Sequence, residues 1–169
     1  MQMIGLLLLS LMLQGSTPAK VEVTFDAKAD FGAFHTYTWT KGYDAFNPNV
    51  HKAIVEALEA QMTAAGFTKV ASGGDVTLAY YTVGSTNVDL KALDKAQKAG
   101  DSNVPTRTLG RLVVAMRKPT TGKPDNETLW TAATREFVDS DPVKMKETVG
   151  LVATRLFDTY PGRKTAPSK

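Results

Sequence analysis

The chain has 169 residues, of which 43% are hydrophobic, a formal net charge of +3 and no cysteine. This size and apolar content are typical of one globular domain with a full core, and they are unlike those of a disordered chain. The lack of cysteine excludes disulfides, thiolate chemistry and lipid attachment at a thiol, and the small charge excess does not indicate nucleic-acid binding.

An uncharged leader precedes the domain. Residues 4–13 are almost entirely apolar, small residues follow them, and the first charged residue is Lys20. This run is shorter than the roughly 20 residues of a membrane-spanning helix and fits the apolar core of a secretory signal peptide. We predict a signal peptide over residues 1–19 and an exported protein, periplasmic or in the outer envelope, that is soluble after cleavage. No basic residue precedes the apolar run, so retention as an uncleaved anchor is the alternative.

Two strands and a helix are predicted in the first part of the domain. Residues 21–25 and 34–39 alternate apolar and polar side chains, as strands do. Asn47 is a suitable N-cap, Pro48 suits the first helical position, and Gly66 suits the end of the same helix. The helix has one apolar face formed by Val50, Ile54, Leu58 and Met62.

Three further strands and two helices are predicted in the second part. The strands cover residues 76–83, 109–117 and 127–137, and an irregular loop over 119–126 joins the last two. A short surface helix is expected over residues 87–99. The last helix begins at Pro142 with Ser140 or Asp141 as its cap, and its buried face comprises Met145, Val149, Val152 and Leu156.

These elements predict an α+β fold, a two-layer sandwich in which two main helices cover one face of a mostly antiparallel five-stranded sheet. The single domain covers residues 20–161, and residues 162–169 form a disordered tail. Phe31 is expected to pack inward beside a turn in which Asp30 accepts backbone N–H groups. Tyr37, Trp39 and Trp130 are interpreted as core residues.

Several segments, in their order and spacing, resemble a known family. They are residues 25–39, 65–67 with 75–80, 110–116 with 129–133, and 156–161. The chain is similar here to the domain of unknown function 4136, which is found in bacterial envelope proteins that are often lipoproteins. The resemblance implies an envelope compartment and a fold, and it supplies no catalytic residues. Many members carry a lipidated cysteine where this chain has Ser16, so we expect no lipid anchor.

No motif in the sequence specifies a reaction. The two imidazoles, His35 and His51, lack the spacing of a metal-binding pair, and no nucleophile elbow or phosphate-binding loop is present. We therefore predict no catalytic residues, no metal and no cofactor. The alternative is a small hydrolase in which His35 acts with a carboxylate such as Asp26 or Asp44.

A basic segment is the most distinctive surface feature of the sequence. No acidic residue lies between Asp101 and Asp125, and Arg107, Arg111 and Arg117 share one parity along a strand. The other face of that strand carries Leu112, Val114 and Met116. The pattern indicates a cationic outer face, which is either a solvated sheet surface or a contact for phospholipid headgroups, lipopolysaccharide or an acidic partner.

The sequence thus predicts a non-enzymatic exported domain, a monomer, that binds an anionic envelope surface or an unknown envelope protein. It does not indicate a nucleic-acid partner. An adaptor that engages protein partners through an exposed strand edge is a further possibility.

Overall fold

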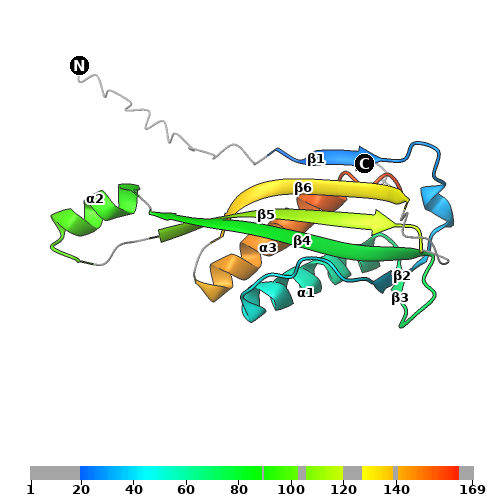
Figure 1. The fold of residues 1–169 in the computed structure, drawn as a ribbon, viewed down its shortest axis with the longest axis horizontal. Helices are drawn as coiled ribbons and strands as arrows, with labels where there is room; N and C mark the ends of the chain where they lie inside the picture. Colours follow the sequence, from blue (N-terminus) through cyan, green and yellow to red (C-terminus); the bar gives the residue numbers. More distant parts are fainter. Residues whose placement is uncertain (1–19, 89, 103–105, 120–126, 139–140, 164–169) are drawn as a thin grey trace, which may run out of the picture.

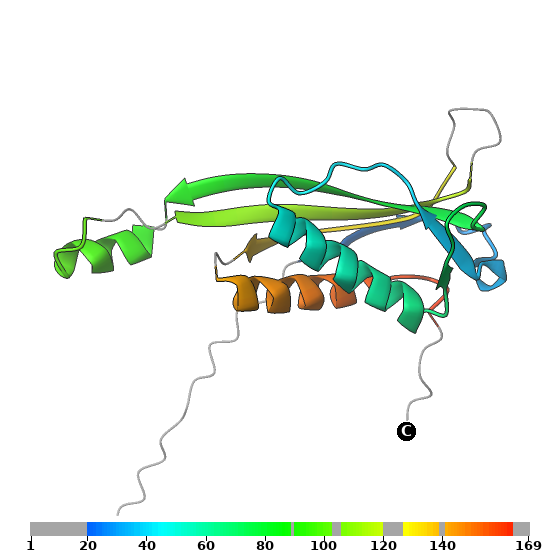
Figure 2. The same ribbon diagram turned by 90° about the horizontal axis from the view of Figure 1, so that it is seen from below.

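The fold is a mixed sheet with two long helices on one face. The computed structural model describes residues 20–88, 90–102, 106–119, 127–138 and 141–163. Its sheet has six strands in the order β1-β6-β5-β4-β2-β3. The helices α1 and α3 lie side by side under this sheet, and α2 projects from the far end of the β4–β5 hairpin (Figure 1, Figure 2).

Six strands, three helices and one short turn make up the described part of the domain. The strands are β1 (Glu22–Phe25), β2 (Thr36–Trp39), β3 (Thr68–Lys69), β4 (Val76–Val88), β5 (Thr106–Arg117) and β6 (Thr128–Val138). The helices are α1 (Pro48–Ala64), α2 (Leu90–Lys98) and α3 (Pro142–Phe157), and a single 3-10 turn, η1, covers Phe31–Ala33.

The mixed α and β content and the two helices on one face confirm the predicted architecture in outline, but the sheet differs from the expected one. It has six strands instead of five, because β3 is only two residues long and shows no alternation in the sequence. Two of its pairings are parallel, those of β2 with β3 and with β4. Helix α1 supplies the crossover that parallel neighbours require.

Several expectations lie outside the described residues. These are the signal peptide over residues 1–19, most of the loop over 119–126, and the tail beyond Arg163. Arg163 itself bonds through Nη1 to Asp158 Oδ1 at 2.6 Å. Among the residues that the structure describes, no helix is long and apolar enough to cross a membrane.

The helix ends form as their sequences predict. The side chain of Asn47 accepts hydrogen bonds from the N–H groups of Asn49 and Val50, and that of Asp141 does the same at the start of α3. These caps satisfy N–H groups that have no partner within a helix. Gly66 follows α1 with a φ of 90°, a conformation that glycine adopts without steric cost.

The core is densest where α1 and α3 end. Trp130 is 0% exposed, and its ring lies 5.2 Å from Phe157 and 5.6 Å from Tyr160 between centroids. Phe31 and Phe67 also contact Tyr160 edge to face. This arrangement confirms the inward positions of Trp130 and Phe31, and it closes one end of the space between sheet and helices with large rings.

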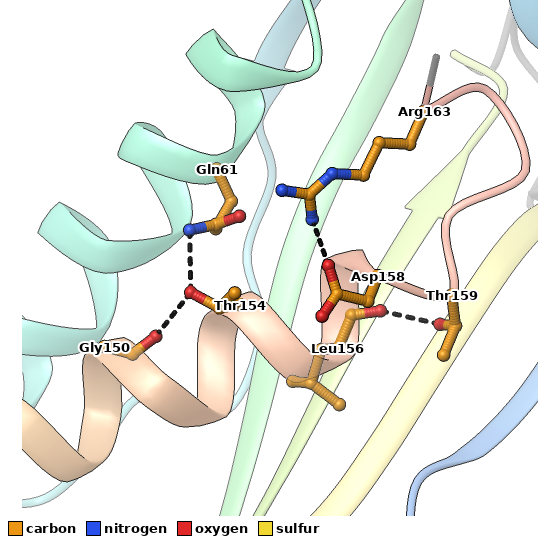
Figure 3. Close-up of polar contacts among 7 residues, drawn as sticks. All are labelled: Gln61, Gly150, Thr154, Leu156, Asp158, Thr159 and Arg163. Atoms are coloured by element: carbon orange, nitrogen blue, oxygen red, sulfur yellow. Dashed lines mark hydrogen bonds and ion pairs between the residues drawn. The ribbon is translucent and has the colours of Figure 1, made fainter. Parts of the chain in front are cut away.

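Polar contacts also join the two helices to each other. Gln61 of α1 donates through Nε2 to Thr154 Oγ1 of α3 at 3.1 Å, and Thr154 in turn donates to the Gly150 carbonyl at 3.0 Å (Figure 3). Lys146 Nζ of α3 lies 3.0 Å from Glu56 Oε2 of α1. The partly buried bond between Gln61 and Thr154 links α1 to α3, whereas the exposed ion pair adds little stability.

The carboxylate of Asp75 joins the start of β4 to the start of β2. It accepts from the N–H groups of His35 and Thr36, both at 2.9 Å, and the Asp75 N–H donates to Thr36 Oγ1 at 3.0 Å. These bonds, that of the His35 N–H first, hold the pKa of Asp75 below its usual value. A carboxyl with a lowered folded-state pKa stabilises the fold above its unfolded pKa of about 3.9, and this stabilisation is lost as pH falls.

We expect Asp75→Asn to lower the free energy of unfolding at pH 7, because the charged acceptor is removed. The difference from the native chain should shrink as pH falls below about 4, where the native carboxyl becomes protonated. Urea unfolding of both proteins at pH 7 and at about pH 3 measures this. A difference that stays constant with pH would contradict the assigned role of the charge.

We expect Gly150→Ala to raise the free energy of unfolding by roughly 0.5–1 kcal/mol, since glycine is unfavourable within a helix. A Cβ at this position would have nothing within 4 Å. Urea unfolding checks the sign. The opposite result is expected for Gly42→Ala, because a Cβ there would lie 1.9 Å from the Tyr80 carbonyl oxygen.

Candidate functional site

Two surfaces of the domain are candidates for function, and the first lies on the helix-free face of the sheet. Leu112, Val114 and Met116 are buried under the helices, as the sequence predicts. Strand alternation places Arg111 on the opposite side. There the Arg111 Nη2 lies 2.7 Å from Glu22 Oε2 of β1.

Two more arginines lie on the same side of the sheet. The guanidinium of Arg117 lies 5.8 Å from the ring centre of Tyr81, a favourable contact between a cation and an aromatic face. Arg135 of β6 is exposed and stands opposite Arg111 in the register. We call Arg111, Arg117 and Arg135 the arginine face.

The third predicted arginine, Arg107, has a side chain outside the described residues. Its backbone belongs to β5 and stands opposite Asn87 of β4. The structure therefore places two of the three predicted arginines, Arg111 and Arg117, on the same side of β5. Arg135 was missed because it lies on a different strand, and only the β5–β6 register reveals it as a neighbour of Arg111.

The second surface is a cavity of about 500 Å³ between the helices and the sheet. It lies away from Trp130, Phe157 and Tyr160, under the first turns of α1 and the middle of α3. Its apolar walls come from Val50 and Ile54 of α1, Val149 and Val152 of α3, and Leu112 of β5. Volumes of this size are typical of ligand pockets.

Two glycines of the sheet leave room for the cavity, because they have no side chains. Gly84 of β4 and Gly110 of β5 stand opposite each other in the register and line the cavity. Both have the parity of Leu112, which faces the helices. The sheet therefore presents two positions without side chains where larger residues would fill the gap.

The rim of the cavity is formed by residues 43–47, and Tyr80 holds this segment in place. The Tyr80 hydroxyl shares a hydrogen bond with Nδ1 of His51 and accepts one from the Ala45 N–H at 3.3 Å. Burial raises the pKa of this hydroxyl, and the nearby Asp44 carboxylate raises it further. Tyr80 is thus a neutral anchor at physiological pH that joins the segment to the first turn of α1.

The arrangement gives little support to the hydrolase alternative. His35 is exposed just before β2, and it does not line the cavity. The other imidazole, that of His51, contacts the Tyr80 hydroxyl, and packing of the 43–47 segment explains this contact. Within the described ranges, no group of three or more metal-binding side chains lies close enough together to hold an ion.

Comparison with known proteins identifies the family. A family model described as a domain of unknown function, DUF4136, matches residues 21–162. The chain belongs to the DUF4136 family. The resemblance inferred from the sequence is therefore confirmed. No curated protein matches the sequence significantly.

Solved structures share the fold at low sequence identity. A DUF4136 family protein from Bacteroides thetaiotaomicron has a TM-score of 0.60 and 12% identity, over 88% of this chain and 99% of that one. A PDZ domain protein from Parabacteroides distasonis has a TM-score of 0.57 and 16% identity over 87% of this chain. This chain spans about a third of the Parabacteroides protein, 36% of its length.

A further similar structure is the PelC dodecamer from Paraburkholderia phytofirmans. Its TM-score is 0.51 with 12% identity, over 88% of this chain and 99% of that chain. At such identities these structures support the fold of this DUF4136 domain and nothing more specific.

We expect Tyr80→Phe to lower the free energy of unfolding by about 1–2 kcal/mol, because the partners of the hydroxyl are left without it. Urea unfolding measures this, and amide exchange of residues 43–47 should accelerate. Tyr81→Phe, on the helix-free face, is the matched control and should change stability by less than about 0.5 kcal/mol. Equal effects of both substitutions would contradict the anchoring role.

Proposed function

We propose that this DUF4136 domain is a non-enzymatic binding domain of the bacterial cell envelope, and that its arginine face contacts an anionic surface. The main support is that Arg111, Arg117 and Arg135 share the face of the sheet opposite α1 and α3. Both of these helices lie on the other side of the sheet (Figure 2). Arginines spread along two neighbouring strands suit an extended anionic surface better than a small ligand.

The charge balance of this face favours phosphate groups. Among the described residues, Glu22 forms an ion pair with one arginine of this face, Arg111. The guanidinium of Arg117 lies against Tyr81, and Arg135 is exposed. Arginine forms paired hydrogen bonds with phosphate oxygens, so phospholipid headgroups and the phosphates of lipopolysaccharide share the chemistry that would be recognised.

The location is proposed from the sequence. The uncharged leader over residues 1–19 supports export, and the chain has no cysteine to carry a lipid. We propose residues 20–161 as the mature domain. Contact with the envelope would then depend on the folded domain itself, and the arginine face is the strongest candidate for that contact. We propose that the domain acts as a monomer.

The test is binding of the mature domain to vesicles of phosphatidylcholine with and without phosphatidylglycerol, and to lipopolysaccharide micelles. Each arginine near an anionic membrane contributes about 1 kcal/mol, so the double variant Arg111→Gln with Arg135→Gln should bind phosphatidylglycerol vesicles at least roughly tenfold more weakly. Glu22→Gln should strengthen binding, and salt should weaken it.

The matched control removes two cations from the helix side of the domain. Lys52 of α1 and Lys146 of α3 are well exposed, with side-chain exposures of 76% and 69%. Lys52→Gln with Lys146→Gln makes the same change in net charge and should leave binding within about twofold. Equal losses in both double variants would mean that total charge, and not the arginine face, governs binding.

A further inference from the structure

One edge of β4 lacks a partner strand next to the cavity. On its outer side, β4 pairs with β2 over Val76–Leu78, and Tyr43 forms an isolated bridge with Tyr81. Beyond Thr82, within the part of the chain that the structure describes, no strand pairs with this side of β4. On its inner side the strand remains paired with β5 as far as Val88.

The backbone hydrogen bonds of β4 show which of its N–H and C=O groups point away from β5. The carbonyls of Leu78 and Tyr80 accept from Thr40 and Tyr43, and the Thr82 N–H donates to the Tyr43 carbonyl at 3.0 Å. Even-numbered residues of β4 therefore direct their backbone groups away from β5. Continuing the alternation, the N–H and C=O groups of Gly84, Thr86 and Val88 face outward on an unpaired edge.

The cavity opens at this same edge. Val83 and Gly84 of β4 belong to its lining. Its rim carries exposed apolar side chains, since Tyr43 is 75% exposed and Phe46 is fully exposed. An unpaired strand edge and an apolar pocket beside it are the two features with which sheets bind extended peptides.

The charged side chains around the cavity favour a ligand of one charge. Asp44 is an exposed carboxylate on the rim, and Glu136 also lines the cavity, where it is paired with Arg155 at 2.6 Å. Arg111 is the cation among the lining residues, and its guanidinium is bonded to Glu22 on the other face. The rim therefore favours a ligand that brings a positive charge close to Asp44.

We propose that the outer edge of β4 and the adjoining cavity bind an extended segment of a partner protein that carries a large apolar side chain next to a lysine or arginine. The backbone of the segment pairs with Gly84, Thr86 and Val88, and its apolar side chain enters the cavity. The same edge of a second copy fits less well, because residues 84–88 contain no basic side chain. The guanidinium groups of the arginine face lie on the other side of the sheet, although Arg111 also borders the cavity.

The experiment uses a phage-displayed library of random heptapeptides, selected on the mature domain, followed by titration of synthesised enriched peptides. The expected result is enrichment of sequences with a large apolar residue beside a basic one. In the complex, amide exchange should slow at Gly84, Thr86 and Val88, because their N–H groups become hydrogen bonded.

Two variants separate the backbone contact from the pocket. Thr86→Pro removes an outward N–H and spares the β4–β5 ladder, so it should weaken peptide binding by about tenfold or more. The control, Thr86→Val, keeps the N–H and should bind the peptides within about twofold of the native domain. Gly110→Val fills the cavity floor with a strand-forming residue and should weaken binding of the same peptides by about tenfold. Asp44→Asn should reduce the preference for a basic residue.

The proposal is overturned if no peptides are enriched, or if enriched peptides bind Gly110→Val as tightly as the native domain. It is also overturned if sedimentation shows a dimer that protects the same three amides without peptide, since the occupant is then a second copy. If Thr86→Pro fails to fold, amide exchange of the native complex decides the backbone contact alone. Vesicle binding by Gly110→Val should stay unchanged, which separates this site from the proposed function.

Discussion

The antiparallel register of β4, β5 and β6 determines which side chains face the helices and which face the other side of the sheet. It runs without interruption from Thr82 opposite Leu112 to Leu78 opposite Met116, and Leu112 stands opposite Thr134 on the other side. Because side chains alternate along a strand, a slip of one residue would turn Arg111 toward the helices and Leu112 toward water. The cost of burying an unpaired guanidinium makes such a slip unfavourable.

The space under the sheet is filled unevenly. Near the ends of α1 and α3, Trp130, Phe157 and Tyr160 pack edge to face and leave little room. At the other end the sheet presents Gly84 and Gly110, and the helices contribute valine and isoleucine, so a cavity remains. The bond between Gln61 and Thr154 joins α1 to α3 beside this uneven core.

Local patterns predicted much of this fold. The apolar faces of α1 and α3, the caps Asn47 and Asp141, and the two sides of β5 all follow from side-chain spacing and hydrogen-bonding chemistry. The parallel pairing of β2 with β3 could not be predicted, because the two residues of β3 are too few to show a strand pattern. Arg135 and the cavity were missed for a different reason. Each depends on residues from separate strands or helices, and only the tertiary register brings them together.

The two candidate surfaces are linked by consecutive residues of one strand. Gly110 lines the cavity, and the next residue, Arg111, belongs to the arginine face on the other side of the sheet. A single layer of backbone therefore separates the two surfaces, and neither covers the other. An anionic surface against the arginine face would leave the edge of β4 accessible from the side. If both proposals hold, the domain can hold an extended segment of a partner protein close to the envelope surface while both sites are occupied.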